Sequence, residues 1–233
     1  MECIILAGGL GTRLRSVTKD ILPKCMAPVN GNPFLHYLFE YLESQRIDRV
    51  VLSVGHRSDT ILDWISDNKF SFDIDHVQEH EPLGTGGAIQ FALQKSKEEH
   101  VLVLNGDTLF LCDLHELYRF HLERSAATSI GLKRMYDYER YGSVIVTEND
   151  VIQSFEEKKY KASGFINAGV YMIDKFAFSE KSLPSKFSFE KAYLETFVSR
   201  KTFYGKAFDN YFIDIGIPED YEKAQTDFIT LFP

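Results

Sequence analysis

A glycine-rich loop near the start of the chain has the composition of a phosphate-binding loop. The segment Ala7-Gly8-Gly9-Leu10-Gly11-Thr12-Arg13-Leu14 follows a short apolar run. Its glycines allow successive backbone N–H groups to approach an anion closely. Leu14 occupies the position of the third glycine of a dinucleotide-binding loop, and the lysine of a Walker loop is also absent. By itself, the loop is therefore compatible with phosphate binding and with a purely structural turn.

Two basic residues accompany this loop. Arg13 lies within it, and Lys24 follows soon after, next to Pro23. Either side chain alone would be explained well as a solvated surface charge. Two cations on one glycine-rich segment instead favour a clamp for a polyphosphate, because guanidinium and ammonium groups bind phosphate oxygens strongly.

An aspartate follows a strongly apolar segment. Asp107 lies just beyond residues 100–104, and open α/β sheets bind ligands at the carboxyl ends of their strands. Carboxylate oxygens are the ligands that Mg²⁺ prefers, although an aspartate after Gly106 would also suit a turn. The seven histidines form no convincing ligand or nucleophile constellation, and the three widely spaced cysteines suit reduced thiols better than disulfides or a zinc site.

The composition of the 233-residue chain excludes several classes of protein. Its 26 Lys and Arg against 34 Asp and Glu give a net charge of −8, which argues against a general nucleic-acid-binding protein. No apolar run approaches the roughly 20 residues that span a bilayer, and the first residues lack the pattern of a secretory leader. We therefore expect a cytoplasmic protein that binds neither nucleic acid nor membranes.

In the first half of the chain, predicted strands alternate with predicted helices, and these elements must position the residues described above. Apolar runs predict strands and amphipathic stretches predict helices, which together indicate parallel βαβ crossovers and a sheet covered on both faces. The expected strands are 3–7, 49–54, 72–77 and 100–105, and the expected helices are 34–45, 59–68 and 87–97.

After Asp107 the pattern changes. Strands are expected over 128–133, 142–146, 151–156 and 164–173, followed by helices over 187–200 and 218–231. Little helix separates these strands, which indicates an antiparallel half. We therefore predict one α/β domain with two lobes.

Five groups of residues occur in an order that resembles the sugar-1-phosphate nucleotidylyltransferases, and they extend over essentially the whole chain. They are the glycine-rich loop with Pro23-Lys24, Pro82-Leu83-Gly84-Thr85-Gly86-Gly87-Ala88, Asn105-Gly106-Asp107, Phe155-Glu156-Glu157-Lys158 and Phe212-Ile213-Asp214-Ile215-Gly216. Within that family, Ala27-Pro28-Val29, Pro82–Ala88 and Tyr211–Tyr221 are most similar to the D-glycero-D-manno-heptose 1-phosphate guanylyltransferases, which make GDP-heptose for bacterial surface glycans.

The resemblance implies a fold and a division of labour. The fold would be a Rossmann-like, mixed and mostly parallel sheet flanked by helices, with a smaller antiparallel sugar-binding lobe. About residues 1–110 would bind the nucleotide, and about residues 111–233 the sugar phosphate. The implied reaction is attack of a sugar 1-phosphate oxygen on the α-phosphorus of a nucleoside triphosphate, with release of pyrophosphate.

The resemblance also implies roles for individual residues. Arg13 and Lys24 would bind the triphosphate and the transition state, Lys158 the sugar phosphate, and Asp107 with Asp214 the Mg²⁺ ion. The implied nucleotide contacts are Leu6, Ala7, Gly8, Gly9, Gly11, Thr12, Glu79, Gly84 and Thr85, and the implied sugar contacts are Tyr141, Gly142, Glu157 and Asn167.

An acidic side chain before Gly84 favours guanine as the base. Glu79 stands where uridylyl relatives carry glutamine, and a carboxylate only accepts hydrogen bonds. Guanine presents N1–H and N2–H side by side, whereas uracil presents one donor flanked by acceptors. GTP is therefore the expected nucleotide, although Glu81 could play the same part.

Several alternatives remain open. The sugar could be mannose or another hexose accepting UMP, since heptose rests on overall likeness, and a non-catalytic nucleotide-sugar-binding subunit is a remote alternative. A homo-oligomer is possible, although core packing explains the aromatic residues of Tyr204–Phe212 better than an interface. Cys25 and Lys159 stand where the family usually has proline, and we expect both replacements to loosen the loops around them.

Overall fold

Four parallel strands form one half of a central sheet. The computed structural model describes residues 1–9, 14 and 21–233. β1 (Glu2–Leu6) lies between β4 (Arg49–Val54) and β6 (His100–Asn105), and β5 (Asp73–Gln78) pairs with β4 at the edge. The inner strands are apolar on both faces because both faces are covered.

The remaining strands extend the same sheet on its other side. β11 (Lys161–Asp174) pairs antiparallel with β6 through its last five residues and, along most of its length, with β8 (Thr128–Tyr138). β9 (Ser143–Val146) and β10 (Ile152–Glu156) follow beyond β11, and β12 (Phe203–Phe208) runs parallel to β8. In the described part of the chain this makes a nine-stranded mixed sheet, which confirms the predicted fold class.

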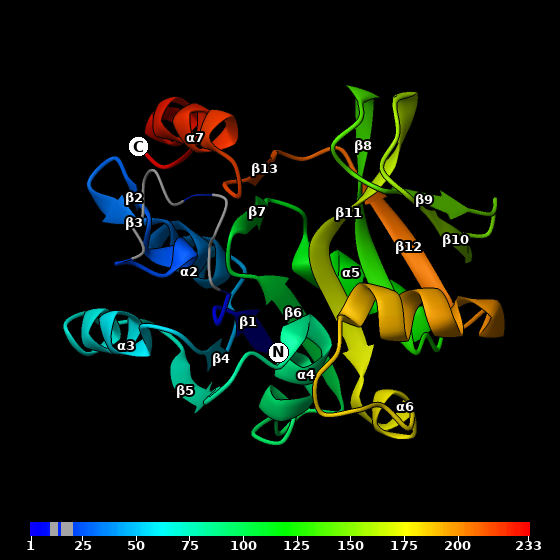
Figure 1. Ribbon diagram of the computed structural model, residues 1–233, viewed down its shortest axis with the longest axis horizontal. Coiled ribbons are helices and arrows are strands. Elements are labelled where there is room, and N and C mark those ends of the chain that lie inside the picture. The colour runs from blue at the N-terminus through cyan, green and yellow to red at the C-terminus, as the bar shows by residue number, and fades with distance from the viewer. Residues whose placement is uncertain (10–13, 15–20) are drawn as a thin grey trace.

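Helices cover this sheet (Figure 1), and outside it β7 (Thr108–Phe110) pairs with β13 (Phe212–Asp214). β7 and β13 lie at the junction between the parallel and the antiparallel strands in that view. The remaining elements are α2 (Phe34–Ser44), α3 (Ser58–Ser66), α4 (Gly84–Ala92), α5 (Leu114–Glu123), α6 (Lys175–Ser179), α7 (Pro218–Leu231), η2 (Lys24–Met26), η3 (Phe189–Glu195), η4 (Val198–Arg200), β2 (Pro28–Val29) and β3 (Asn32–Pro33).

The core consists of two apolar clusters, one on each face of the sheet. Successive side chains of a strand point to opposite faces. Accordingly, Cys3 and Ile5 of β1 pack into a cluster with residues of α2, α5 and α7. Ile4 packs into the second cluster with residues of α4, α6 and η3. Each helix therefore buries an apolar face against the sheet, giving three layers.

The observed elements match the expected ones best where the apolar pattern is strongest. β4, β6 and α7 have the expected bounds. α4 begins at Gly84 rather than residue 87 and ends at Ala92 rather than residue 97, whereas β8 and β11 are longer than expected. Within the expected helix 187–200, η3 is a π-helix followed by the 3₁₀ turn η4.

The aromatic residues near the end of the chain contribute to the core. Phe203 and Phe208 are buried, and Phe212 packs against the first cluster. Within residues 1–9, 14 and 21–233, no helix has the length and apolar character needed to cross a bilayer.

A buried histidine links α5 to the sheet. His121 is fully buried, and its Nε2 lies 3.1 Å from His100 Nδ1 while its Nδ1 lies 3.0 Å from Ser129 Oγ. Burial lowers the pKa of His121 to about 4, and the charge of His100 adds to this effect, although Asp174 opposes it. The folded protein therefore holds this imidazole neutral under conditions in which an unfolded chain would protonate it.

We predict that this histidine makes the protein less stable in mild acid. Above the unfolded pKa of roughly 6.5 both states are neutral, so stability does not depend on this group. As the pH falls from about 6.5 to about 4, only the unfolded chain binds a proton at this histidine. The free energy of unfolding therefore falls by about 3 kcal/mol. Urea unfolding at a series of pH values should show that the free energy of unfolding falls less in acid for His121→Gln than for the parent. His56→Gln, at an exposed position, should behave like the parent. Equal losses in His121→Gln and the parent would contradict this assignment.

Candidate active site

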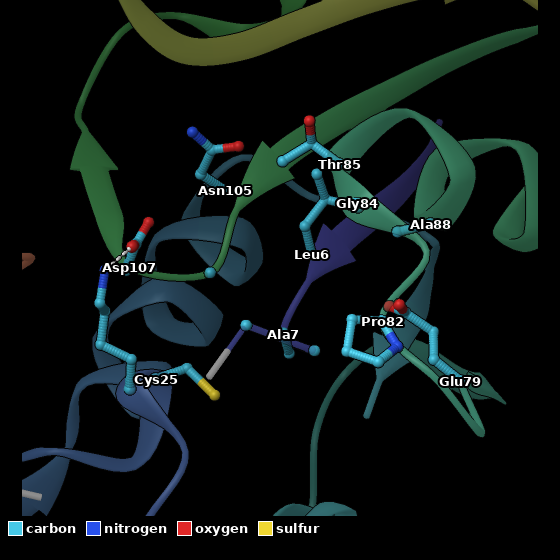
Figure 2. A pocket seen from close by; sticks show the side chains of 14 residues that line it. Leu6, Ala7, Cys25, Glu79, Pro82, Gly84, Thr85, Ala88, Asn105 and Asp107 are labelled. Atoms are coloured by element: carbon cyan, nitrogen blue, oxygen red, sulfur yellow. Dashed lines mark hydrogen bonds and ion pairs between the residues drawn. The ribbon is translucent and has the colours of Figure 1, made fainter. Parts of the chain in front are cut away.

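A cavity of about 480 Å³ opens at the carboxyl ends of β1 and β6 (Figure 2). This is the edge at which open α/β sheets bind their ligands. The cavity is lined by Leu6, Ala7, Gly8, Gly9, Lys24, Cys25, Glu79, Pro82, Gly84, Thr85, Ala88, Asn105, Gly106 and Asp107. The structure thus brings most of the predicted nucleotide contacts together with one predicted cation and one predicted metal ligand.

Lys24 and Asp107 form an ion pair at one end of the cavity. Lys24 Nζ contacts Asp107 Oδ2, and both side chains are largely buried. Lys24 begins the turn η2, which is closed by hydrogen bonds from Met26 N to Pro23 O (2.9 Å) and from Ala27 N to Lys24 O (3.0 Å). The ammonium is therefore presented by a short backbone turn rather than by a free surface chain.

Strand pairing brings the second predicted metal ligand to the first. β13 pairs antiparallel with β7 so that Asp214 lies opposite Thr108, and Ile215 N donates to Asp107 O at 3.0 Å. A Cβ placed on Gly216 would lie 2.7 Å from Asp214 Oδ1 and 3.2 Å from Lys24 Nζ. The ammonium and the Asp214 carboxylate therefore lie beside one point, which only a glycine leaves open.

The donor set at this end of the cavity fits a divalent cation. Asp107 and Asp214 offer carboxylate oxygens, which suit a hard cation that keeps waters and shares substrate phosphates. Among the residues described, no group of three or more His, Cys, Asp and Glu side chains could hold a metal ion. Two aspartates would therefore have to share such an ion with substrate.

Glu79 lies at the other end of the cavity, beside Pro82 (Figure 2). Ser53 Oγ donates to its Oε1 (3.1 Å) and Leu83 N donates to its Oε2 (3.0 Å), so the carboxylate is fixed by one bond on each oxygen. Gly8 packs directly against it, because a Cβ at this position would lie 2.5 Å from Oε1. Glu81, the alternative considered for this part, is exposed and does not line the cavity.

The amino terminus of α4 contributes backbone groups to the cavity wall. The first N–H groups of a helix have no partner within the helix. Gly86 N and Gly87 N donate to Phe187 O at 3.0 and 3.4 Å, whereas Gly84 and Thr85 line the cavity. The N–H groups available to a ligand at this wall are therefore those of Gly84 and Thr85.

The predicted residues of the antiparallel half do not line this cavity. Glu157 and Lys158 are exposed after β10, and Glu157 Oε1 accepts a hydrogen bond from Lys191 Nζ at 2.6 Å. Gly142 packs against the backbone of β10, since a Cβ there would lie 2.7 Å from Glu156 O. Tyr141 contacts the ring of Phe212. The sugar-binding roles given to these residues remain predictions.

Asn167 occupies an irregular part of β11 rather than a turn between strands. The register of β11 against β8 shifts between Asn167 and Tyr171, and Gly169 in this stretch has a φ of +72°. Asn167 Nδ2 donates to Tyr171 Oη (2.9 Å), and its Oδ1 accepts from Gly169 N (3.0 Å). Its amide thus stabilises the irregularity. Gly11, Thr12 and Arg13 lie outside the described residues, so their predicted roles also remain predictions.

The family model for nucleotidyl transferases matches residues 2–230 of this chain. The chain belongs to the nucleotidyl transferase family. It is 50% identical, over 97% of its length and 98% of the relative's, to D-glycero-alpha-D-manno-heptose 1-phosphate guanylyltransferase of Aneurinibacillus thermoaerophilus. The protein of that name from Campylobacter jejuni is 47% identical over 95% of this chain and 97% of its own. The crystal structure of HddC from Yersinia pseudotuberculosis complexed with GMP-PN is 39% identical, with a TM-score of 0.87 over 97% of this chain and 99% of that one.

Asn105 is the most informative cavity residue of this nucleotidyl transferase that sequence reasoning left without a role. In the described part of the chain its side-chain amide has no hydrogen-bond partner, and Figure 2 shows it between Thr85 and Asp107 on the wall. A Cβ at Gly169 would lie 2.6 Å from Asn105 Nδ2, so the left-handed glycine makes room for it. Asn105 is the last residue of β6, and its position at the carboxyl end of a buried strand is the signal by which the sequence indicates a cavity residue.

Cys25 also lines the cavity, where the family usually has proline. Burial raises the pKa of its thiol to about 12, and the neighbouring charge of Asp107 raises it further. The side chain therefore acts as a small apolar wall rather than a nucleophile. Pro82, Ala88 and Gly106 complete the lining that the predicted list did not contain.

We predict that two adjacent glycines of the cavity respond differently to a methyl group. Gly8→Ala must displace the fixed Glu79 carboxylate, which breaks a hydrogen bond and lowers the free energy of unfolding by about 1–2 kcal/mol. Among the described residues, Gly9→Ala meets no atom within 4 Å, and it should stay within about 0.5 kcal/mol of the parent. Thermal unfolding without nucleotide measures both variants. A Gly8→Ala protein as stable as Gly9→Ala would show that Glu79 moves freely.

Proposed function

We propose that the chain transfers GMP from GTP to D-glycero-α-D-manno-heptose 1-phosphate, producing GDP-heptose and pyrophosphate for a bacterial surface glycan. The names of two relatives that are about half identical over nearly the full length support this activity. The similarity to HddC, whose crystal structure contains GMP-PN, supports a guanine nucleotide. We further propose that about residues 1–110 bind the nucleotide and about residues 111–233 the sugar phosphate.

The observation that carries the proposal is the arrangement of charge along one cavity. Lys24 and Asp107 lie at one end with Asp214 beside them, and Glu79 lies at the other. In the proposed complex, a nucleotide lies along the cavity with its phosphates near Lys24 and its base near Glu79. The glycine-lined wall at Gly8 and Gly9 would then face the connecting part of the nucleotide.

The proposed reaction needs alignment and neutralisation of charge more than proton transfer. The attacking oxygen belongs to a sugar phosphate that is already ionised near neutral pH, so no general base is required. Lys24 would hold phosphate oxygens in line, and the N–H groups near Gly8 would stabilise the charge that develops on them. We propose that Asp107 and Asp214 hold Mg²⁺, which when bound would supply neutralising charge to the phosphates.

Free lone pairs on Glu79 favour guanine over the other bases. An ionised carboxylate has about four lone-pair sites, and Ser53 and Leu83 use one on each oxygen. One site per oxygen is left, which suits the neighbouring N1–H and N2–H donors of guanine. Uracil would bring two carbonyl oxygens to the same carboxylate, where they would repel it.

The sugar site would lie next to the cavity, toward β11. We propose that Tyr141, Gly142, Glu157, Lys158 and Asn167 contribute to it. Asn167 supports this placement because Gly169, which donates to its Oδ1, packs against Asn105 of the cavity wall. The exposed Lys158 has a long flexible chain that would have to reach the phosphate from the surface of the protein.

Pyrophosphate release from a panel of substrates tests the function. GTP with heptose 1-phosphate should exceed, in kcat/KM, every other pairing of GTP, ATP, CTP or UTP with heptose, mannose or glucose 1-phosphate. Asp107→Ala, assayed in parallel at saturating substrate, should lose about 100-fold or more in kcat, because the lost charge acts in the transition state. A preference for UTP would contradict the guanylyltransferase assignment, and a preference for mannose would contradict the heptose.

We predict that Glu79→Gln weakens the preference for GTP. The amide places N–H groups against the guanine donors, so the KM for GTP should rise about tenfold, which corresponds to about 1.4 kcal/mol. Discrimination against UTP should fall at the same time. Glu81→Gln is the matched control, since Glu81 is exposed and lies outside the cavity lining. An unchanged GTP:UTP ratio in Glu79→Gln would remove this carboxylate from the base site.

A further inference from the structure

The glycines at the start of α4 are in close contact with a segment that lies about a hundred residues later in the chain. Gly84 has a φ of +73°, and a Cβ there would lie 2.5 Å from Phe187 O. Phe187 N donates to Leu83 O at 2.9 Å, and Phe187 O accepts from Gly86 N. The wall of the cavity at Gly84 and Thr85 is therefore held from behind by the chain that leads into η3.

The hydroxyl of Thr85 is fully used in this junction. Its Oγ1 accepts from Phe189 N at 2.9 Å and donates to Glu190 Oε2 at 3.0 Å. Ser188 Oγ donates to the same carboxylate oxygen at 2.9 Å. Because the hydroxyl hydrogen of Thr85 is used by Glu190, the donor that Thr85 can offer a nucleotide is its backbone N–H. The direction of that backbone N–H is then set by what holds the side chain.

Glu190 belongs to η3, whose apolar residues pack against the antiparallel half of the protein. Its charge contributes, after burial, to raising the pKa of the fully buried Tyr171. Tyr171 Oη in turn accepts from Asn167. Glu190 is thus bonded to Thr85, while its neighbour Phe189 packs against the ring of Tyr171 with centroids 5.0 Å apart. It is a partly buried carboxylate that ties the amino terminus of α4 to η3.

We infer that Glu190 is a positioning residue of the active site, which holds Thr85 so that the N–H groups of Gly84 and Thr85 face the nucleotide. This inference rests on the proposed function, in that the cavity binds a nucleoside triphosphate. Glu190 does not line the cavity and is not a catalytic residue. It acts through the hydroxyl of Thr85, where the amino terminus of α4 contacts the π-helix η3.

The expected effect is on binding of the nucleotide. Without the carboxylate, Thr85 and Ser188 lose their common acceptor and the amino terminus of α4 can turn away from the cavity. The KM for GTP of Glu190→Ala should then rise about tenfold, as expected for loss of hydrogen bonds to a charged group. kcat should stay within about threefold, and the KM for the sugar phosphate should change less than that for GTP.

Matched variants of the full chain separate positioning from general stability. Glu190→Gln keeps an oxygen acceptor for Thr85 and should keep a KM within about threefold of the parent. Glu195→Ala removes a carboxylate of the same helix that pairs with Lys191 on the surface and should leave both KM values unchanged. Thr85→Val should raise the KM by itself but add little to Glu190→Ala, because both changes break the same link.

Steady-state kinetics with GTP and the sugar phosphate, together with thermal unfolding, decide the matter. A KM for GTP in Glu190→Ala equal to that of the parent would overturn the inference, as would equal increases for both substrates or additive effects with Thr85→Val. If the parent uses another nucleoside triphosphate, the proposed base preference fails while the same comparison with that nucleotide still tests Glu190. If the parent uses none, both proposals are wrong.

Discussion

The hydrogen bond from Ile215 N to Asp107 O is the contact on which the acidic end of the cavity depends. It continues the pairing of β7 with β13 and so joins two segments that are far apart in the chain. Two carboxylates held close together repel each other unless a cation lies beside them. Lys24 supplies one, because its ammonium pairs with Asp107 and approaches Gly216 next to Asp214. Strand pairing and charge compensation therefore stabilise the same small region.

The parts of the fold that could be predicted are those whose pattern has a local cause. β6 is apolar on both faces because helices cover both, and α7 begins with Pro218, which suits a first turn. The outer part of β11 is partly exposed, and its bounds depend on pairing with β8, a partner that the local sequence does not reveal. The early start of α4 depends on Phe187 in the same way.

In the predicted site, too, the residues with a local sequence signal could be located, whereas contacts with distant segments could not. Gly8 and Asp107 follow directly from the ends of buried strands, so recognising the strands locates them. The sequence also suggested Glu79, but not that Ser53 and Leu83 fix its carboxylate. Conversely, Gly84 was interpreted as a nucleotide contact, whereas it and the other glycines of α4 also permit the close approach of another chain segment. Side-chain identity was readable from the sequence, but the partners that restrain each side chain were not.

The charges of the cavity decide where affinity for a triphosphate has to come from. Among the described lining residues, Lys24 is balanced by Asp107, and Glu79 leaves the lining with a net negative charge. Phosphate oxygens brought to Lys24 would also compete with Asp107 for the same ammonium. Side-chain charge in the described lining therefore cannot by itself attract an anionic nucleotide to a chain of net charge −8. Under the proposed function, backbone N–H groups, a divalent cation held by the two aspartates and the predicted Arg13, which lies outside the described residues, would supply the attraction.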